Sequence, residues 1–249
     1  MNSRRVKLPL VHPTDAIDAL QSRSLQVLAL RSQPGDADHR GLVNALATLA
    51  QHAIDSCLAP GARAIQLDCL AEIQRWSRSP FALRVKALRS QALEGAIVAE
   101  NSTAAAVAQM LTLAPQPESA LQPHIERALV RHARQASYYA CSAVVLTVDA
   151  LDEPRRAIDA PAQVAGALAH KAVWSTSSEP LLARVRDHAA FWLEHEQGES
   201  AADSAPAGAH SQHELELQLW HEFIGVTWKA QRDAQFGRLC SFLDWALAR

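Results

Sequence analysis

Apolar residues recur along most of this chain with the period of an α-helix. The clearest series is Leu42, Leu46, Leu49, Ala50, Ala53 and Cys57, at positions i, i+4, i+7, i+8, i+11 and i+15. Because an α-helix has about 3.6 residues per turn, these side chains share one face. The series predicts a helix that begins near Asp36 to Asp38 and ends before Pro60-Gly61.

The same period predicts further helices on both sides of this one. Thr14 and Asp15 would cap a helix that carries Ile17, Leu20 and Leu28, and the helix that ends at Trp76 places Ile65, Cys69 and Ile73 on one stripe. Another is expected from Pro80 to about Glu100, where Asn101 to Thr103 would cap a short fifth helix. Later helices are expected over residues 124–149, 154–174, 180–196 and 211–249. The chain is therefore predicted to be all-α, with about ten helices packed as antiparallel hairpins.

Proline and small polar residues divide the helical pattern into four regions. Pro115, Pro117 and Pro123 interrupt it, because proline lacks an amide donor and disfavours helix in the residue before it. We expect a first helical unit over residues 1–114 and a second over residues 115–196. Residues 197–210 are rich in Gly, Ser, Ala and acidic side chains, so a flexible linker is expected there. The helical region 211–249 is expected to dock back on the body.

One phrase of the sequence occurs twice, which indicates an internal duplication. The first copy runs from Pro60 to Ile65 and on to Trp76, and the second runs from Pro154 to Ile158 and on to Trp174. The first is followed by Arg84-Val85-Lys86 and the second by Arg184-Val185-Arg186. If the copies are equivalent, both tryptophans are buried at matching places, and Pro80 and Pro180 each begin a helix.

Composition and charge narrow the class of protein. The chain has 249 residues with only 9 glycines and 5% aromatics, which favours close-packed helices over sheets. The formal net charge of −2, with no clear basic patch, argues against a nucleic-acid partner. The four cysteines form no Cys-x-x-Cys pair, which favours a reducing compartment. No secretory signal follows the basic N-terminus, and no apolar run reaches the ~20 residues needed to cross a membrane, so we expect a cytoplasmic protein.

Candidate catalytic and metal-binding residues form no strong motif. His195-Glu196, His210, His213-Glu214 and His221-Glu222 recur near the predicted linker, but there is no His-Glu-x-x-His, and solvated helix ends explain them better than a zinc site. No Gly-x-Ser-x-Gly or Gly-rich phosphate loop occurs. His132 and Cys141 lie nine residues apart on one predicted helix, too far for a thiolate pair. We therefore expect no metal and no cofactor.

A charged turn is the densest polar feature outside the predicted linker. It consists of Asp152, Glu153, Arg155, Arg156 and Asp159 around Pro154. One interpretation is helix capping, because acidic residues before a first turn favour the positive end of the helix dipole. The other is an edge that recognises a partner, because charges of both signs on a rigid turn fix register and orientation. On the second interpretation these five residues are the candidate partner-binding site.

The stretch from Asp152 to Ala160, which enters an alanine-rich helix and is followed by Trp174, resembles a known family. It is similar to the acidic-Pro-Arg-x-Ala-Ile-acidic-Ala turn of Ala-rich helical immunity proteins from bacterial polymorphic toxin systems. The resemblance implies a helical, non-enzymatic protein that binds and neutralises a toxin encoded beside it. Our leading hypothesis is therefore a cytoplasmic protein-binding module of this kind. The alternatives are an all-α enzyme with a site between the two helical units, and a helical-repeat scaffold.

Overall fold

The computed structural model describes residues 22–113, 122–175 and 212–247. This part of the chain is all-helical and contains no β-strand, which confirms the predicted class. The helices are α1 Arg23–Arg31, α2 Ala37–Cys57, α3 Pro60–Arg78, α4 Val85–Leu113, α5 Gln122–Asp149, α6 Ala160–Ser175 and α8 Gln212–Leu247, with a 3-10 helix, η1, at Pro154–Asp159. None of these helices is both long enough and apolar enough to cross a membrane.

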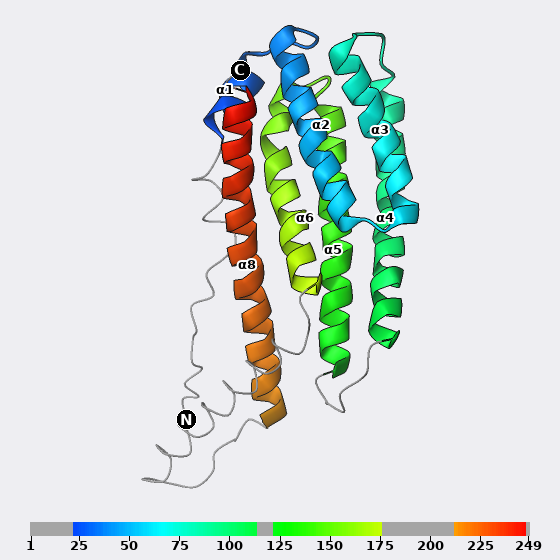
Figure 1. The fold of residues 1–249 in the computed structure, drawn as a ribbon, viewed down its shortest axis with the longest axis vertical. Coiled ribbons are helices and arrows are strands. Elements are labelled where there is room, and N and C mark those ends of the chain that lie inside the picture. Colours follow the sequence, from blue (N-terminus) through cyan, green and yellow to red (C-terminus); the bar gives the residue numbers. More distant parts are fainter. Residues whose placement is uncertain (1–21, 114–121, 176–211, 248–249) are drawn as a thin grey trace, which may run out of the picture.

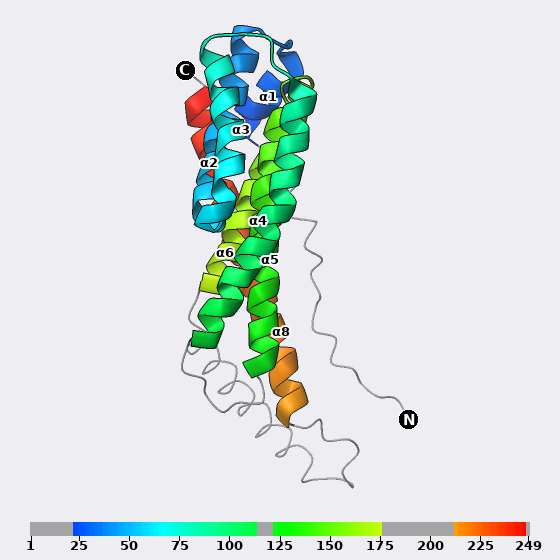
Figure 2. The ribbon, with the colours of Figure 1, turned by 90° about the vertical axis from the view of Figure 1, so that its right-hand side faces the viewer.

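The long helices run roughly side by side and form an elongated bundle (Figure 1). Helices α4, α5, α6 and α8 pack in that order, each against the next. Helices α2 and α3 pack on each other and cover this row, with α2 against α5 and α6 and α3 against α4 (Figure 2). Helix α1 and η1 lie in contact with each other at the end of the bundle where α8 finishes.

The apolar stripe predicted for α2 is the centre of the core. All six of its predicted positions are buried, and Leu42 and Ala53 are completely inaccessible. One cluster of buried residues extends from Leu25 in α1 to Leu243 in α8. It includes residues from both of the predicted units, whose division at residue 115 stays a prediction.

The buried faces of α5 and α6 are rich in small side chains. Ala136, Ala140 and Ala143 of α5 are fully buried, as are Ala165 and Ala167 of α6. Small residues at such a contact let two helix backbones approach closely. Gly166 lies against the ring of Tyr139, so that a Cβ atom added there would be 3.3 Å from the ring.

The start of α2 is tied to the end of α5. Asp36 caps α2 by accepting a hydrogen bond from the amide of His39 at 2.6 Å. The amides of Gln33 and His39 hold the pKa of Asp36 below its ordinary value. The His39 side chain is buried, and its Nε2 lies 2.7 Å from the carbonyl oxygen of Ala150. This contact holds the first turn of α2 against the turn that follows α5.

Helix α4 differs from the prediction at both ends. It begins at Val85 rather than at Pro80, and it continues without a break through Asn101 to Leu113. The expected short fifth helix is therefore wrong. Thr103 does not cap a new helix, because its buried hydroxyl accepts a hydrogen bond from the amide of Ala59 at 3.3 Å. Burial of Ala99, Ala104 and Val107 keeps both halves of α4 on the bundle.

The two copies of the repeated phrase adopt different local structures. Pro60 begins an α-helix directly, whereas Pro154 begins the 3-10 helix η1, and α6 starts only at Ala160. Trp76 is buried, with 9% of its surface exposed, and Trp174 is half-buried. The helix expected from Pro180 and the expected linker 197–210 lie outside the described residues. The equivalence of the copies therefore fails at their first turns.

Candidate functional site

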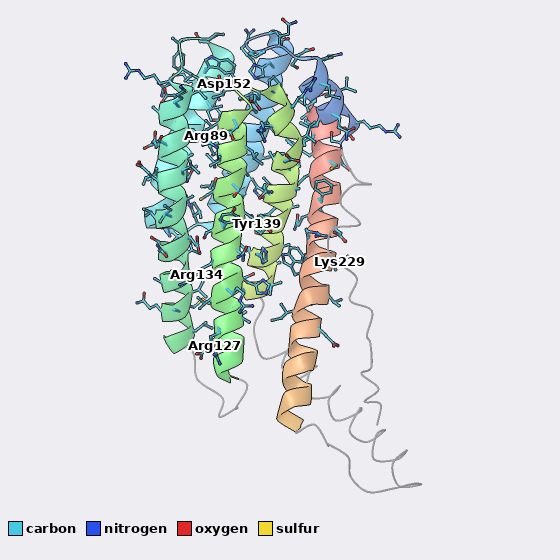
Figure 3. The ribbon with its side chains drawn as sticks, turned by 180° about the vertical axis from the view of Figure 1, so that it is seen from behind. Arg89, Arg127, Arg134, Tyr139, Asp152 and Lys229 are labelled. Atoms are coloured by element: carbon cyan, nitrogen blue, oxygen red, sulfur yellow. The ribbon has the colours of Figure 1, made fainter. Side chains whose placement is uncertain are left out.

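The five predicted partner-binding residues occupy the turn between α5 and α6 at one end of the bundle. Figure 3 labels Asp152 there. The side chains of Asp152, Glu153, Arg155, Arg156 and Asp159 are all exposed. Arg156 forms a surface ion pair with Glu153, with 3.0 Å between Nε and Oε2. Within the described residues Arg155 makes no ion pair, so its guanidinium is available to a partner.

Buried apolar residues hold this charged turn in place. The carbonyl of Asp149 accepts hydrogen bonds from the amides of Asp152 and Glu153, at 3.2 and 3.0 Å. Pro154 and Ala157 of η1 are buried against the core. The backbone of the turn is thus anchored while its charged side chains point into solvent.

The first residue of η1 has no side-chain hydrogen-bond cap. Glu153 is the N-cap residue of η1, but its side chain makes no capping hydrogen bond to the backbone. It instead faces Arg156 across the surface. No hydrogen bond to the backbone of η1 therefore occupies the Glu153 carboxylate, and the dipole interpretation of the turn stays a prediction.

Helix α1 places Leu30 beside the charged turn, and Val27 lies one helical turn before Leu30. It buries Leu25, Leu28 and Ala29, but Val27 and Leu30 are 54% and 59% exposed. A hollow of about 420 Å³ lies between the two elements. It is lined by Ala29, Leu30 and Ser32 of α1 and by Glu153, Pro154 and Arg155 of the turn. We call the five charged residues together with Val27 and Leu30 the end surface.

The C-terminal turns of α8 hold α1 in this position. Asp244 accepts a hydrogen bond from the Ser22 hydroxyl at 2.6 Å and another from the Ser24 amide at 3.0 Å. The Ser22 hydroxyl also caps α1, because it accepts from the amide of Leu25 at 3.2 Å. The bond from Ser22 is the main reason that the pKa of Asp244 lies below its ordinary value. A nine-residue helix that would not be stable alone is thereby held at its first turn.

Sequence reasoning located the charged half of the end surface and missed its apolar half. Five apolar residues occur within six positions from Leu25 to Leu30. A helix that packs on one side only has room for about half of such a run. The run from Leu25 to Leu30 thus has more apolar residues than one packed face can cover, which could have predicted that part of α1 remains exposed.

All four cysteines are buried, and the described residues contain no assembled metal centre. Burial raises the pKa of Cys57 and Cys141 to about 12 and that of Cys69 to about 11, so these thiols stay protonated. No three His, Cys, Asp or Glu side chains in the described part of the chain converge as metal ligands would. His195, Glu196 and His210 lie outside the described residues.

The chain matches no protein-family model, and no curated protein or solved structure shows significant similarity to it. The class that the fold and the site define is therefore a helical bundle with a mixed charged and apolar surface at one end.

Proposed function

We propose that this protein is a non-enzymatic protein-binding module that engages its partner through the end surface. The observation that supports the proposal best is that charged and apolar side chains are exposed side by side on the end surface. Exposed charges of both signs stand on a turn with buried anchors, next to two exposed aliphatic side chains.

Each half of the end surface supplies what a protein interface needs. Val27 and Leu30 offer apolar area that a partner can remove from water. Arg155 and Asp159 offer charges that steer a partner and set its orientation. Because Pro154 and Ala157 anchor the turn, little conformational entropy is lost when a partner binds.

The particular module we propose is a bacterial immunity protein that acts in the cytoplasm and neutralises a cognate toxin. The support is the resemblance of residues 152–160 and Trp174 to the turn of Ala-rich immunity proteins, together with the exposure of that turn. An immunity protein needs a preformed surface that covers a toxin, and the end surface has this character.

Co-expression with the product of the adjacent gene tests this function. Cells that produce this product should grow only when the protein is also present. The double variant Arg155→Glu/Arg156→Glu should lose protection and weaken binding by roughly 30-fold, about 2 kcal/mol, in calorimetric titration. Its melting temperature should stay close to that of the unmodified protein, because surface substitutions change stability by about 0.5 kcal/mol or less.

A matched control uses the same charge reversal at another place on the molecule. Arg134 of α5 and Lys229 of α8 lie near the middle of the bundle, away from Asp152 (Figure 3). The variant Arg134→Glu/Lys229→Glu should keep full protection. Equal loss in both variants would show that net charge acts rather than the end surface, and unchanged binding in both would remove the proposed interface.

A further inference from the structure

A second polar cluster lies inside the bundle, between α5, α6 and α8. His132 of α5 and His170 of α6 are hydrogen-bonded through their Nδ1 atoms at 2.8 Å. The His170 ring stacks on Tyr139, with 5.4 Å between centroids and 17° between planes. On α8, the Trp228 ring lies 5.1 Å from the His170 ring. Three helices thus contribute to one set of four rings.

The histidine pair is neutral and has a fixed hydrogen-bonding pattern. Burial lowers the pKa of His132 to about 4, with a further contribution from Arg131. Burial also lowers the pKa of His170 to about 3, and His132 adds to that effect. In a neutral pair, one Nδ1 donates its proton to the other Nδ1. One Nε2 is then a hydrogen-bond donor, and the other Nε2 is an acceptor.

The pair forms part of the wall of a cleft of about 550 Å³. The α5 side contributes Arg127, Ala128, Arg131, His132, Gln135 and Tyr139, and the other side contributes His170, Ile224, Gly225 and Trp228. Arg127, Arg131 and Gln135 are exposed, whereas His170 is 8% exposed. The cleft therefore leads from a polar rim to an aromatic interior, and its volume falls in the usual range for small-molecule sites.

The charge at the rim is positive. Arg127 and Arg131 are one turn apart on α5, and Figure 3 shows Arg127 and Tyr139 along this helix. Within the described residues Arg131 has no ion-pair partner. Farther along α8, Arg232 stacks on Trp228 at 4.9 Å and is paired with Asp233. A guanidinium without an acid beside an aromatic cleft is suited to a carboxylate, which it can bind through two parallel hydrogen bonds.

Helix packing alone gives no reason for this polarity. Every other buried side chain of α6, from Ala160 to Val173, is apolar, apart from Gly166, which has none. Burying two imidazoles disfavours folding unless their polar atoms are used. The Trp228 indole adds a buried Nε1 donor with no partner in the described structure. Burying the two imidazoles and the Trp228 indole N–H reduces the stability of the fold. Their presence in a cleft that is open to solvent therefore indicates a binding site.

We propose that this cleft binds a small planar aromatic carboxylate. The carboxylate pairs with the guanidinium of Arg131, and the flat ring contacts the Trp228 and Tyr139 rings. The histidine pair supplies a donor and an acceptor at fixed positions to polar substituents on the ligand ring. The site is separate from the end surface and does not depend on the proposed function.

Calorimetric titration of the full chain with three probes tests the ligand class. Benzoate should bind with a Kd near or below about 1 mM, the strength expected for a ligand of this size in a good site. Benzamide, which has the same shape and no charge, should bind at least tenfold more weakly. Cyclohexanecarboxylate, which has the charge but no flat ring, should also bind at least tenfold more weakly. No benzoate binding up to 10 mM, or equal binding of all three probes, would overturn the proposal.

A pair of variants tests the location of the site. Arg131→Gln should weaken benzoate binding at least tenfold and leave benzamide binding unchanged. Arg134→Gln is the matched control, because Arg134 is also exposed on α5 but does not line the cleft. Equal weakening in both variants would show general charge attraction and would contradict the site. Unchanged melting temperatures in both variants confirm that the fold is intact.

Discussion

The end surface and the cleft lined by His132 and His170, here called the histidine cleft, are both polar, but their polar groups are arranged in opposite ways. The charges of the end surface come from eight consecutive positions, residues 152–159, and stay in water. The four rings of the cleft come from three helices and are buried or half-buried. Exposed charges disturb the fold little, whereas buried polar groups must find partners. The fold is therefore insensitive to substitutions in one region and sensitive to them in the other.

The largest difference is expected when one side chain is truncated in each region. His170→Ala removes a ring packed between Tyr139 and Trp228 and leaves His132 without its hydrogen-bond partner. The free energy of unfolding should fall by about 2 to 5 kcal/mol. Arg155→Ala, in the exposed turn, should change it by less than about 0.5 kcal/mol. Urea denaturation of both variants measures the difference, and similar values would contradict the contrast between the regions.

An intermediate effect is expected from pH. The folded-state pKa values of His132 and His170, about 4 and about 3, lie below the ordinary histidine value of 6.5. Between pH 6.5 and about 4 the unfolded chain therefore binds protons that the folded chain does not. Stability is full above pH 6.5 and falls as the pH drops, by up to about 1.4 kcal/mol per pH unit for each histidine.

Denaturation curves at pH 7, 6 and 5 check this dependence. The double variant His132→Gln/His170→Gln should have a flatter profile over that interval, whatever its stability at pH 7. His52, which is exposed on α2, provides the control. His52→Gln should leave the dependence of the unfolding free energy on pH unchanged. If this control alone had a flatter profile, the pH dependence would not come from His132 and His170.

The smallest effect is expected at the ion pair of the end surface. Glu153→Gln removes the pair with Arg156, whose two side chains are 67% and 57% exposed. Exposed ion pairs contribute about 0 to 1 kcal/mol to stability. The free energy of unfolding should therefore fall by only about 0.3 kcal/mol. The difference should shrink further in 0.5 M salt. A loss above about 1.5 kcal/mol would mean that the turn is a structural element rather than a free surface.

The same contrast explains which features could be predicted from the sequence. The stripe of α2 was predictable because helical spacing is local, and the exposure of Arg155 and Asp159 followed from their charge. The pairing of His132 with His170 was not predictable. These residues are 38 positions apart, and their contact depends on how far α5 slides along α6. Likewise, Asn101 to Thr103 look like a cap in sequence, but Thr103 is engaged by Ala59 from another part of the chain.

The length of α8 gives the two regions a mechanical connection. This helix has 36 residues and is therefore about 54 Å long. Trp228 near its middle belongs to the cleft, and Asp244 near its end holds the start of α1. An opening of α8 that reached its last turns would also release α1, which is too short to stay helical alone. A ligand bound in the cleft would stabilise the packing of α8 on α6. It would therefore also stabilise the position of α1, and with it Val27 and Leu30, at the other end of the bundle.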